Sequence, residues 1–229
     1  MMGQGSPNLF ENNIFANMRS GVRPGGFMLT KRIAACCNFQ HGARVVDIGC
    51  GTGTTVEYLR DVGGLYAIGV DLSALLVEQG KKRTGDLQLI QSSGEELPFD
   101  DHSFDGVLAE CSLSVMSDVG RVFAEMNRIL VPGGKLGITD LYARDRSCNF
   151  GACNSSGIMT YNEMAQVLRD HGFKIMVFED QSRFLKEFVV KFIMEHGSAE
   201  ELWQCAGIEK SDKKTYKLGY YLLIAEKCS

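Results

Sequence analysis

The sequence predicts an α/β protein in which a mostly parallel sheet is covered on both faces by helices. Short apolar runs typical of buried strands alternate with amphipathic stretches of about ten residues, the length of a short helix. Parallel strands need crossover connections, and helices of this length supply them. The chain has 229 residues, 45% of them hydrophobic, which is enough to bury one sizeable core.

The alternation can be followed from residue 43 onward. The expected strands are ARVVDIG (43–49), YAIGVD (66–71), LQLIQ (87–91), FDGVLAE (104–110), GKLGITDLY (134–142), FKIMVFED (173–180) and KLGYYLLIAEK (217–227). The expected helices are TTVEYLRDVG (54–63), SALLVEQGKKR (73–83), VGRVFAEMNRIL (119–130) and MTYNEMAQVLRDHG (159–172). We expect Thr160 to cap the last helix and Pro132-Gly133-Gly134 to close the one before it.

Helical segments flank this core. PNLFENNIFANM (7–18) and FMLTKRIAACCNF (27–39) have helical apolar spacing, and RPGG separates them. One or two further helices are expected before the last strand. We therefore predict a single domain. It consists of an N-terminal helical lid (1–40), a core (43–182), a helical insertion (183–207) and the last strand (217–227).

Composition restricts the partners and the compartment. The net charge is -4 and no basic block occurs, which argues against nucleic acid as a partner. No secretion signal or membrane-spanning run is recognisable, so we expect a cytoplasmic protein. We also expect either a monomer or a homodimer. The eight cysteines are expected to be thiols, and neither they nor the four histidines match a common zinc pattern, so no metal site is predicted.

The stretch VVDIGCGTGTT (45–55) places a glycine-rich turn between a strand and a helix. Backbone N–H groups and the helix dipole then point toward a bound ligand. Position 54, where a dinucleotide fingerprint has its third glycine, is Thr54, and Asp47 would repel a pyrophosphate. The turn therefore favours a cationic or zwitterionic ligand over a nicotinamide dinucleotide.

The next strand adds the features of a nucleoside site. Asp71 ends YAIGVD, eighteen residues beyond Gly53, where a carboxylate can accept the hydroxyls of a ribose. Leu72 beside it offers an apolar face to a base.

Four segments occur in a fixed order between about residue 43 and residue 140: VDIGCGTG, GVD, SSGEELPFDDHSFDGVL and EMNRILVPGGKL. Together they resemble the class I S-adenosylmethionine-dependent methyltransferases, especially the branch that acts on small molecules. The resemblance implies a Rossmann-like sheet of seven strands in the order 3-2-1-4-5-7-6, with the last strand antiparallel. It also implies S-adenosylmethionine as the cofactor.

The resemblance assigns roles to particular positions. Asp47 would lie near the ammonium group of the cofactor, and Asp71 would hold its ribose beside Leu72. Ser93 and Gly94 stand where the family usually has Asp-Ala, so the contact to adenine would rest more on backbone groups. The turn that frames the methionine moiety comprises Gly49, Cys50, Gly51, Thr52 and Gly53, with Cys50 facing the cofactor through its backbone.

The acceptor site is expected at LAECSLSVMSD, which follows the fourth strand. The Asn/Asp-Pro-Pro-Tyr motif of methylases that act on exocyclic and amide nitrogens is missing. Glu110 and Tyr142 lie at strand ends on the same edge, where they could orient or deprotonate a substrate, and Glu110 could also contact the cofactor.

Two cysteines leave a narrower alternative open. The surroundings of Cys111 and Cys148 are similar to segments of arsenite methyltransferases, in which such thiolates bind trivalent arsenic. A small cysteine at a strand end is more often part of the core. The leading hypothesis is a methyltransferase acting on a small molecule. The alternatives are methylation of a thiophilic acceptor, a nicotinamide-dependent oxidoreductase and a non-catalytic cofactor-binding protein.

Overall fold

The computed structural model describes residues 23–144, 158–205 and 217–228 of the chain. Its strands form one sheet in the order β3-β2-β1-β4-β5-β8-β7. Their bounds are β1 Arg44–Ile48, β2 Tyr66–Asp71, β3 Leu89–Gln91, β4 Phe104–Glu110, β5 Leu130–Ala143, β6 Met159–Thr160, β7 Phe173–Asp180 and β8 Leu218–Lys227.

The observed topology confirms the predicted fold class. Strands β1 to β5 pair in parallel, whereas β8 runs antiparallel to both β5 and β7. Counted without the short β6, this is the expected order, with the last strand antiparallel. The two-residue β6 pairs with the end of β5 and was not predicted, since two residues carry no recognisable alternation.

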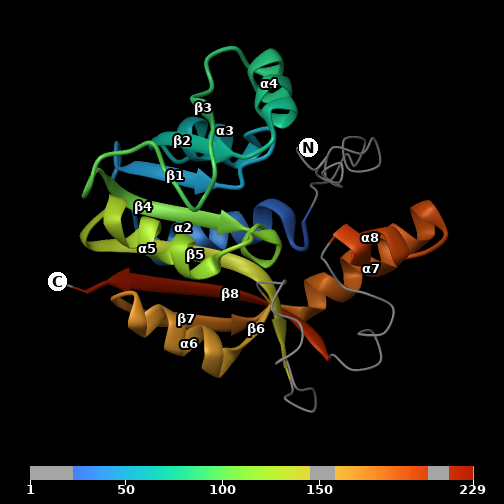
Figure 1. Cartoon of the computed structure of the whole chain (residues 1–229). Coiled ribbons are helices and arrows are strands. Elements are labelled where there is room, and N and C mark those ends of the chain that lie inside the picture. The colour runs from blue at the N-terminus through green and yellow to red at the C-terminus, as the bar shows by residue number, and fades with distance from the viewer. Residues whose placement is uncertain (1–22, 145–157, 206–216, 229) are drawn as a thin grey trace, which may run out of the picture.

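Helices cover both faces of the sheet, as predicted. Their bounds are α2 Gly26–Cys37, α3 Thr54–Asp61, α4 Ala74–Arg83, α5 Val119–Ile129, α6 Tyr161–Asp170, α7 Ser182–His196 and α8 Glu200–Cys205, with a short 3₁₀ turn, η2, at Leu113–Val115. In Figure 1, α5 and α6 lie in front of the sheet and α2 lies behind it. Buried side chains of α5 and α6 share one core cluster, and those of α2, α3, α4 and α7 share the other.

One predicted boundary was wrong. Pro132-Gly133-Gly134 does not follow the helix as a turn, because β5 already begins at Leu130 and runs through it. Phe104 pairs with Leu130 while Gly106 pairs with Lys135, so the extra residues form a bulge in which Gly133 has φ +76°. The expected cap was confirmed: Thr160 forms a capping box with Glu163 at the start of α6.

The flanking segments are described in part. The helix expected at 7–18 lies outside the described residues, whereas the second N-terminal helix is α2. The insertion is helical and consists of α7 and α8. In the described part of the chain, no helix is long and apolar enough to cross a membrane. The division of the chain into lid, core and insertion within one domain remains a prediction.

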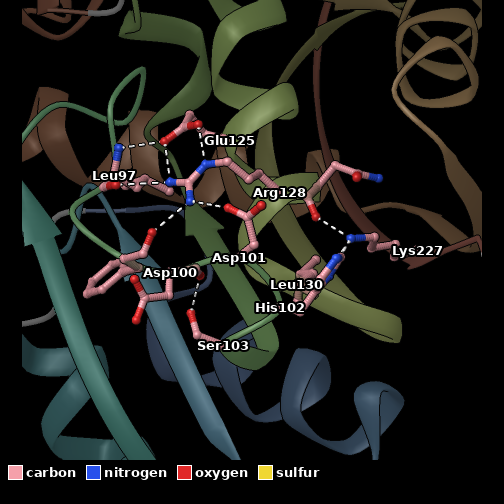
Figure 2. Close-up of polar contacts among 11 residues, drawn as sticks. Leu97, Asp100, Asp101, His102, Ser103, Glu125, Arg128, Leu130 and Lys227 are labelled. Carbon is pink, nitrogen blue, oxygen red and sulfur yellow. Dashed lines mark hydrogen bonds and ion pairs between the residues drawn. The ribbon is translucent and has the colours of Figure 1, made fainter.

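Two of the four sequence segments that carry the family resemblance bind each other (Figure 2). Arg128 of α5 donates to the carbonyls of Leu97 and Phe99 and to the carboxylate of Asp101, at 2.7 to 3.0 Å. Glu125, one turn earlier on α5, binds the Arg128 guanidinium and accepts from the N–H of Leu97. These contacts fix the segment before β4 against α5.

Candidate active site

The predicted polar site residues gather at one edge of the sheet. Asp47 lies near the end of β1, Asp71 ends β2 and Glu110 ends β4. These three strands are neighbours and run parallel, so their carboxyl ends meet at the same edge. In open α/β sheets this edge is where ligands bind.

The glycine-rich turn connects β1 to α3 with three residues in left-handed conformations. Gly49, Gly51 and Gly53 have φ of +78°, +56° and +76°. The N–H groups of Gly49 and Cys50 both donate to the carbonyl of Val70 on β2, at 2.8 and 3.0 Å. Glycine is the residue that adopts this backbone without steric cost. The turn is thereby held against β2 and leads directly into the N-terminus of α3.

Gly49 has a second requirement, which comes from packing. A Cβ on Gly49 would lie 2.4 Å from the Cβ of Ser112, in the segment after β4. By contrast, nothing lies within 4 Å of a Cβ built on Gly51. Gly49 thus lets the segment after β4 approach the turn closely, whereas Gly51 meets a conformational requirement alone.

Asp47 is a buried carboxylate whose charge is poorly compensated. Asp47 is 3% exposed, and no other described residue donates a hydrogen bond to its carboxylate. Burial, together with the negative charge of Glu110, raises the pKa of Asp47 to about 8, although Arg23 acts in the opposite direction. A positively charged ligand group beside Asp47 would favour its ionised form.

Asp71 ties the glycine turn to the start of α4. One carboxylate oxygen accepts from the N–H of Gly51 at 2.7 Å, and the other accepts from the N–H of Ser73 at 2.9 Å. Each oxygen keeps a further lone pair for a ligand hydroxyl. Leu72 next to it is 67% exposed, so an apolar surface stands beside this carboxylate.

The segment after β3 is held in place by hydrogen bonds to the carboxylate of Glu95. The hydroxyl of Ser93 donates to the carboxylate of Glu95, which also accepts from the N–H groups of Ser117 and Asp118. Gly94 is buried against Ile48. Because the Ser93 hydroxyl already has a partner, the predicted contact of this segment to a base would fall to its backbone.

The Cys50 side chain packs inward, and Thr52 binds a neighbouring helix through its backbone. The sulfur of Cys50 lies against Gly69 of β2, and burial raises the pKa of this thiol well above its ordinary value. The carbonyl of Thr52 accepts from Arg83 of α4 at 3.2 Å.

The carboxylate of Glu110 binds side chains from the segment before α2, from α2 and from α3. Arg23 binds it through Nη2 and Nε, at 3.0 and 3.2 Å. The hydroxyls of Thr30 on α2 and Thr55 on α3 donate to it at 2.9 to 3.1 Å. The Glu110 carboxylate is therefore fixed within a network of side chains and is poorly placed to remove a proton from a substrate.

Cys111 follows Glu110 in a left-handed conformation, with φ +58°, which is uncommon for a residue with a side chain. Its N–H donates to the carbonyl of Thr139 on β5 at 2.6 Å. Burial and the charge of Asp140 raise the pKa of the Cys111 thiol to about 12. The group is a neutral thiol near pH 7. Cys148 lies outside the described residues.

Tyr142 lies at the same edge as Glu110 but on the opposite face of the sheet. Its hydroxyl donates to Asp180, at the end of β7, over 3.0 Å. Its ring packs edge to face on Phe178 and Tyr221, within the core cluster that includes α6. The structure thus groups Glu110 and Cys111 together and places Tyr142 apart from them.

Comparison with known proteins identifies the family. The methyltransferase domain model matches residues 46–138. The chain is 27% identical to O-methyltransferase resE of Aspergillus sclerotiorum over 223 aligned residues, covering 87% of this chain and 81% of resE. It is 37% identical to a demethylmenaquinone methyltransferase of Renibacterium salmoninarum over 99 residues, covering 43% of this chain and 41% of that protein.

The chain is a class I S-adenosylmethionine-dependent methyltransferase. Its cofactor is S-adenosylmethionine.

Solved structures agree on the fold of this methyltransferase. Phosphoethanolamine N-methyltransferase 2 of Haemonchus contortus, in complex with S-adenosylmethionine, superposes with a TM-score of 0.75 at 20% identity, covering 94% of this chain and 55% of that one. The [4+2]-cyclase SpnF superposes with a TM-score of 0.70 at 26% identity, covering 88% of this chain and 80% of that one.

The sequence analysis missed Arg23 and the two threonines that bind Glu110. Arg23 was read only as part of a helix-breaking RPGG segment. Because 87 residues separate Arg23 from Glu110, no local spacing could pair them. The strand-end position of Asp140 made it a candidate to orient or deprotonate a substrate, but its hydrogen bond to the N–H of Ser114 was not predicted.

Proposed function

We propose that this methyltransferase transfers the methyl group of S-adenosylmethionine to a hydroxyl oxygen of a small organic acceptor. The observation that carries this proposal is the extent of the similarity to fungal O-methyltransferases. Besides resE, O-methyltransferase cnsE of Penicillium expansum is 26% identical, covering 88% of this chain and 78% of cnsE. Such similarity extends beyond residues 46–138, into the segments that shape an acceptor site.

The residues at the sheet edge fit the cofactor. Asp47, buried and lacking a hydrogen-bond partner among the described residues, suits the ammonium group of a methionine moiety. Asp71 suits the ribose hydroxyls, and the exposed side chain of Leu72 suits one face of adenine. S-adenosylmethionine supplies a methyl group bonded to a sulfonium, which is electrophilic without further activation.

The protein's own contribution is positioning and the exclusion of water. The N–H groups and glycines of residues 49–53 form a rigid turn, and residues 93–94 offer backbone groups beside it. Glu110 is fixed by Arg23 and keeps this end of the site in place. Tyr142 remains a proposed orienting group for the acceptor, supported only by its place near the carboxyl end of β5, since its hydroxyl already donates to Asp180.

No observation favours the alternative in which thiols capture arsenite. Binding of trivalent arsenic requires thiolates, and the raised pKa of Cys111 keeps its thiol protonated near pH 7. The proposal of oxygen as the acceptor atom rests on the similarity to the fungal O-methyltransferases.

Calorimetry with S-adenosylhomocysteine tests the proposed cofactor site. Asp71→Ala should weaken binding at least about tenfold, because it removes the ribose partner and the tie to Gly51. Asp86→Ala is the matched control, since that side chain is 75% exposed on the surface and should leave binding unchanged. Equal affinities for wild type and Asp71→Ala would reject the assignment of Asp71.

The acceptor class is tested with S-adenosylmethionine carrying a labelled methyl group and a panel of phenols, enols, amines and thiols. We expect labelled methyl ethers from phenols or enols. Product formed only with amines or thiols would reject oxygen as the acceptor atom.

A further inference from the structure

The segment after β4 is a compact turn, residues 111–116, which we call the β4 turn. It starts with the left-handed Cys111 and continues through the 3₁₀ turn η2. It lies directly against the cofactor turn, because the Cβ of Ser112 occupies the space that a Cβ on Gly49 would need. An acceptor bound next to the glycine turn at this edge of the sheet would lie beside this turn.

Asp140 is the principal anchor of the β4 turn. Its residue is 1% exposed, and one carboxylate oxygen accepts from the N–H of Ser114 at 3.0 Å. The N–H of Leu141 donates to the other oxygen at 2.7 Å. The Ser114 side chain and the Leu113 backbone also favour the ionised carboxylate, and so lower the pKa of Asp140 that burial raises. The carboxylate thus acts as a cap for η2, supplied from the neighbouring strand β5.

The surroundings of Asp140 also argue against a role as a general base. The carboxylate is closed off from solvent and held by the N–H groups of Ser114 and Leu141, so it is poorly placed to reach a substrate and remove its proton. Its charge is balanced by hydrogen bonds from the turn itself, an arrangement that is stable only while the turn keeps its shape.

Two further bonds hold the start of the turn. The hydroxyl of Ser112 donates to the carbonyl of Ile48 at the end of β1, over 2.8 Å. The N–H of Cys111 donates to the carbonyl of Thr139 on β5 at 2.6 Å. The turn is consequently bound to the strands on both sides of β4.

The far end of the turn contacts the adenine side of the site. Met116 packs against Gly94, whose Cβ, if present, would lie 3.3 Å from the Met116 side chain. The carboxylate of Glu95 accepts from the N–H groups of Ser117 and Asp118 immediately after the turn. One short segment therefore touches the glycine turn at one end and the segment after β3 at the other.

We propose that Asp140 is a positioning residue for methyl transfer, which acts by fixing the β4 turn between the cofactor and the acceptor. This inference rests on the proposed function. Asp140 makes no described hydrogen bond to the glycine turn or to Asp71, so its expected effect is on the placement of the acceptor more than on the affinity for cofactor.

The test compares Asp140→Asn with Asp118→Asn. Both variants replace an aspartate that caps a helical turn by an amide of equal size. Asp118, however, is exposed and caps α5 through the N–H of Arg121. Three quantities are measured: amide hydrogen exchange of residues 111–116, the Kd for S-adenosylhomocysteine, and kcat with the best acceptor of the panel.

In Asp140→Asn we expect exchange in residues 111–116 to be at least about tenfold faster, with the rest of the sheet unchanged. The Kd for S-adenosylhomocysteine should stay within about twofold, while kcat falls about 100-fold, the loss typical of small misplacements of reacting groups. Asp118→Asn should match the wild type in all three. Should Asp140→Asn fail to fold, Ser114→Ala, which removes a single donor, should show the same pattern with smaller changes.

Three results would overturn the proposal: unchanged exchange in residues 111–116, a loss of cofactor affinity as large as the loss of kcat, or faster exchange throughout the sheet. A wild-type protein that binds S-adenosylhomocysteine but methylates no acceptor oxygen would count against the proposed function. The exchange and affinity measurements would still decide whether Asp140 anchors the turn independently of cofactor binding.

Discussion

Arg23 and Glu110 form a buried two-point ion pair, with Nη2 to Oε1 at 3.0 Å and Nε to Oε2 at 3.2 Å. Their side chains are 15% and 3% exposed. The pair joins the start of the described N-terminal segment to the end of β4. Its second effect is electrostatic, since the positive charge of Arg23 lowers the pKa of Asp47, which burial and Glu110 raise.

Arg23→Gln should lower the free energy of unfolding by about 3 kcal/mol, because it leaves the Glu110 carboxylate buried without its cation. Urea denaturation measures the loss. The double variant Arg23→Gln/Glu110→Gln should recover part of it, since no buried charge is then left alone. As a control, Lys82→Gln breaks the exposed pair with Glu78 and should cost less than about 0.5 kcal/mol. Equal losses for Arg23→Gln and Lys82→Gln would contradict the structural role of the pair.

The affinity for S-adenosylhomocysteine should depend on pH through Asp47. In the free protein the pKa of Asp47 is about 8, above its ordinary 3.8, so the carboxyl is increasingly protonated as the pH falls below 8. An ammonium group binds the ionised form, and binding below pH 8 must therefore release a proton. Affinity should fall about tenfold per pH unit below 8, until the pH reaches the pKa of Asp47 in the complex.

Calorimetry in two buffers with different ionisation enthalpies measures this proton release directly. Asp47→Asn, which cannot titrate, should bind more weakly at pH 8 and lose the pH dependence attributed to Asp47. If the wild type and Asp47→Asn show the same pH profile and the same proton release, Asp47 is not the partner of the ammonium group.

The sequence allowed the edge of the sheet to be predicted, but not the contacts across it. Asp47, Asp71 and Glu110 could be brought together because the carboxyl ends of neighbouring parallel strands share one edge. The binding of Arg23 to Glu110 depends on how α2 packs on the sheet, and residue spacing carries no information about that.

The same limit explains the misplaced start of β5 and the surroundings of Tyr142. Pro-Gly-Gly chemistry suits a turn and a bulge equally well, and only the pairing with β4 decides between them. Tyr142 was correctly placed at the end of its strand. Alternation shows that Tyr142 and Leu141 face opposite sides, but does not show which side faces α6.

Arg128→Ala should lower the free energy of unfolding by about 2 kcal/mol, because the guanidinium connects α5 to two carbonyls before β4. The loss should appear in urea denaturation, with little change in the Kd for S-adenosylhomocysteine of the folded protein. Arg121→Ala on the same helix is the control, since the described hydrogen bond of Arg121 is made by its backbone N–H, and its side chain acts on Glu125 only through its charge. A stability loss in Arg121→Ala as large as that in Arg128→Ala would contradict this explanation.

Gly49→Ala and Gly51→Ala should separate the packing requirement of the glycine turn from its conformational requirement. Both residues have positive φ, so an alanine costs about 1 to 2 kcal/mol of unfolding free energy at either position. Only Gly49→Ala also brings a Cβ within 2.4 Å of Ser112, and its additional cost should be at least about 1 kcal/mol. Urea denaturation of both variants measures the difference. The double variant Gly49→Ala/Ser112→Gly removes the colliding Cβ and should therefore be more stable than the sum of its two single changes predicts. Strict additivity of the two changes would show that the close approach of the β4 turn does not account for the sensitivity of Gly49.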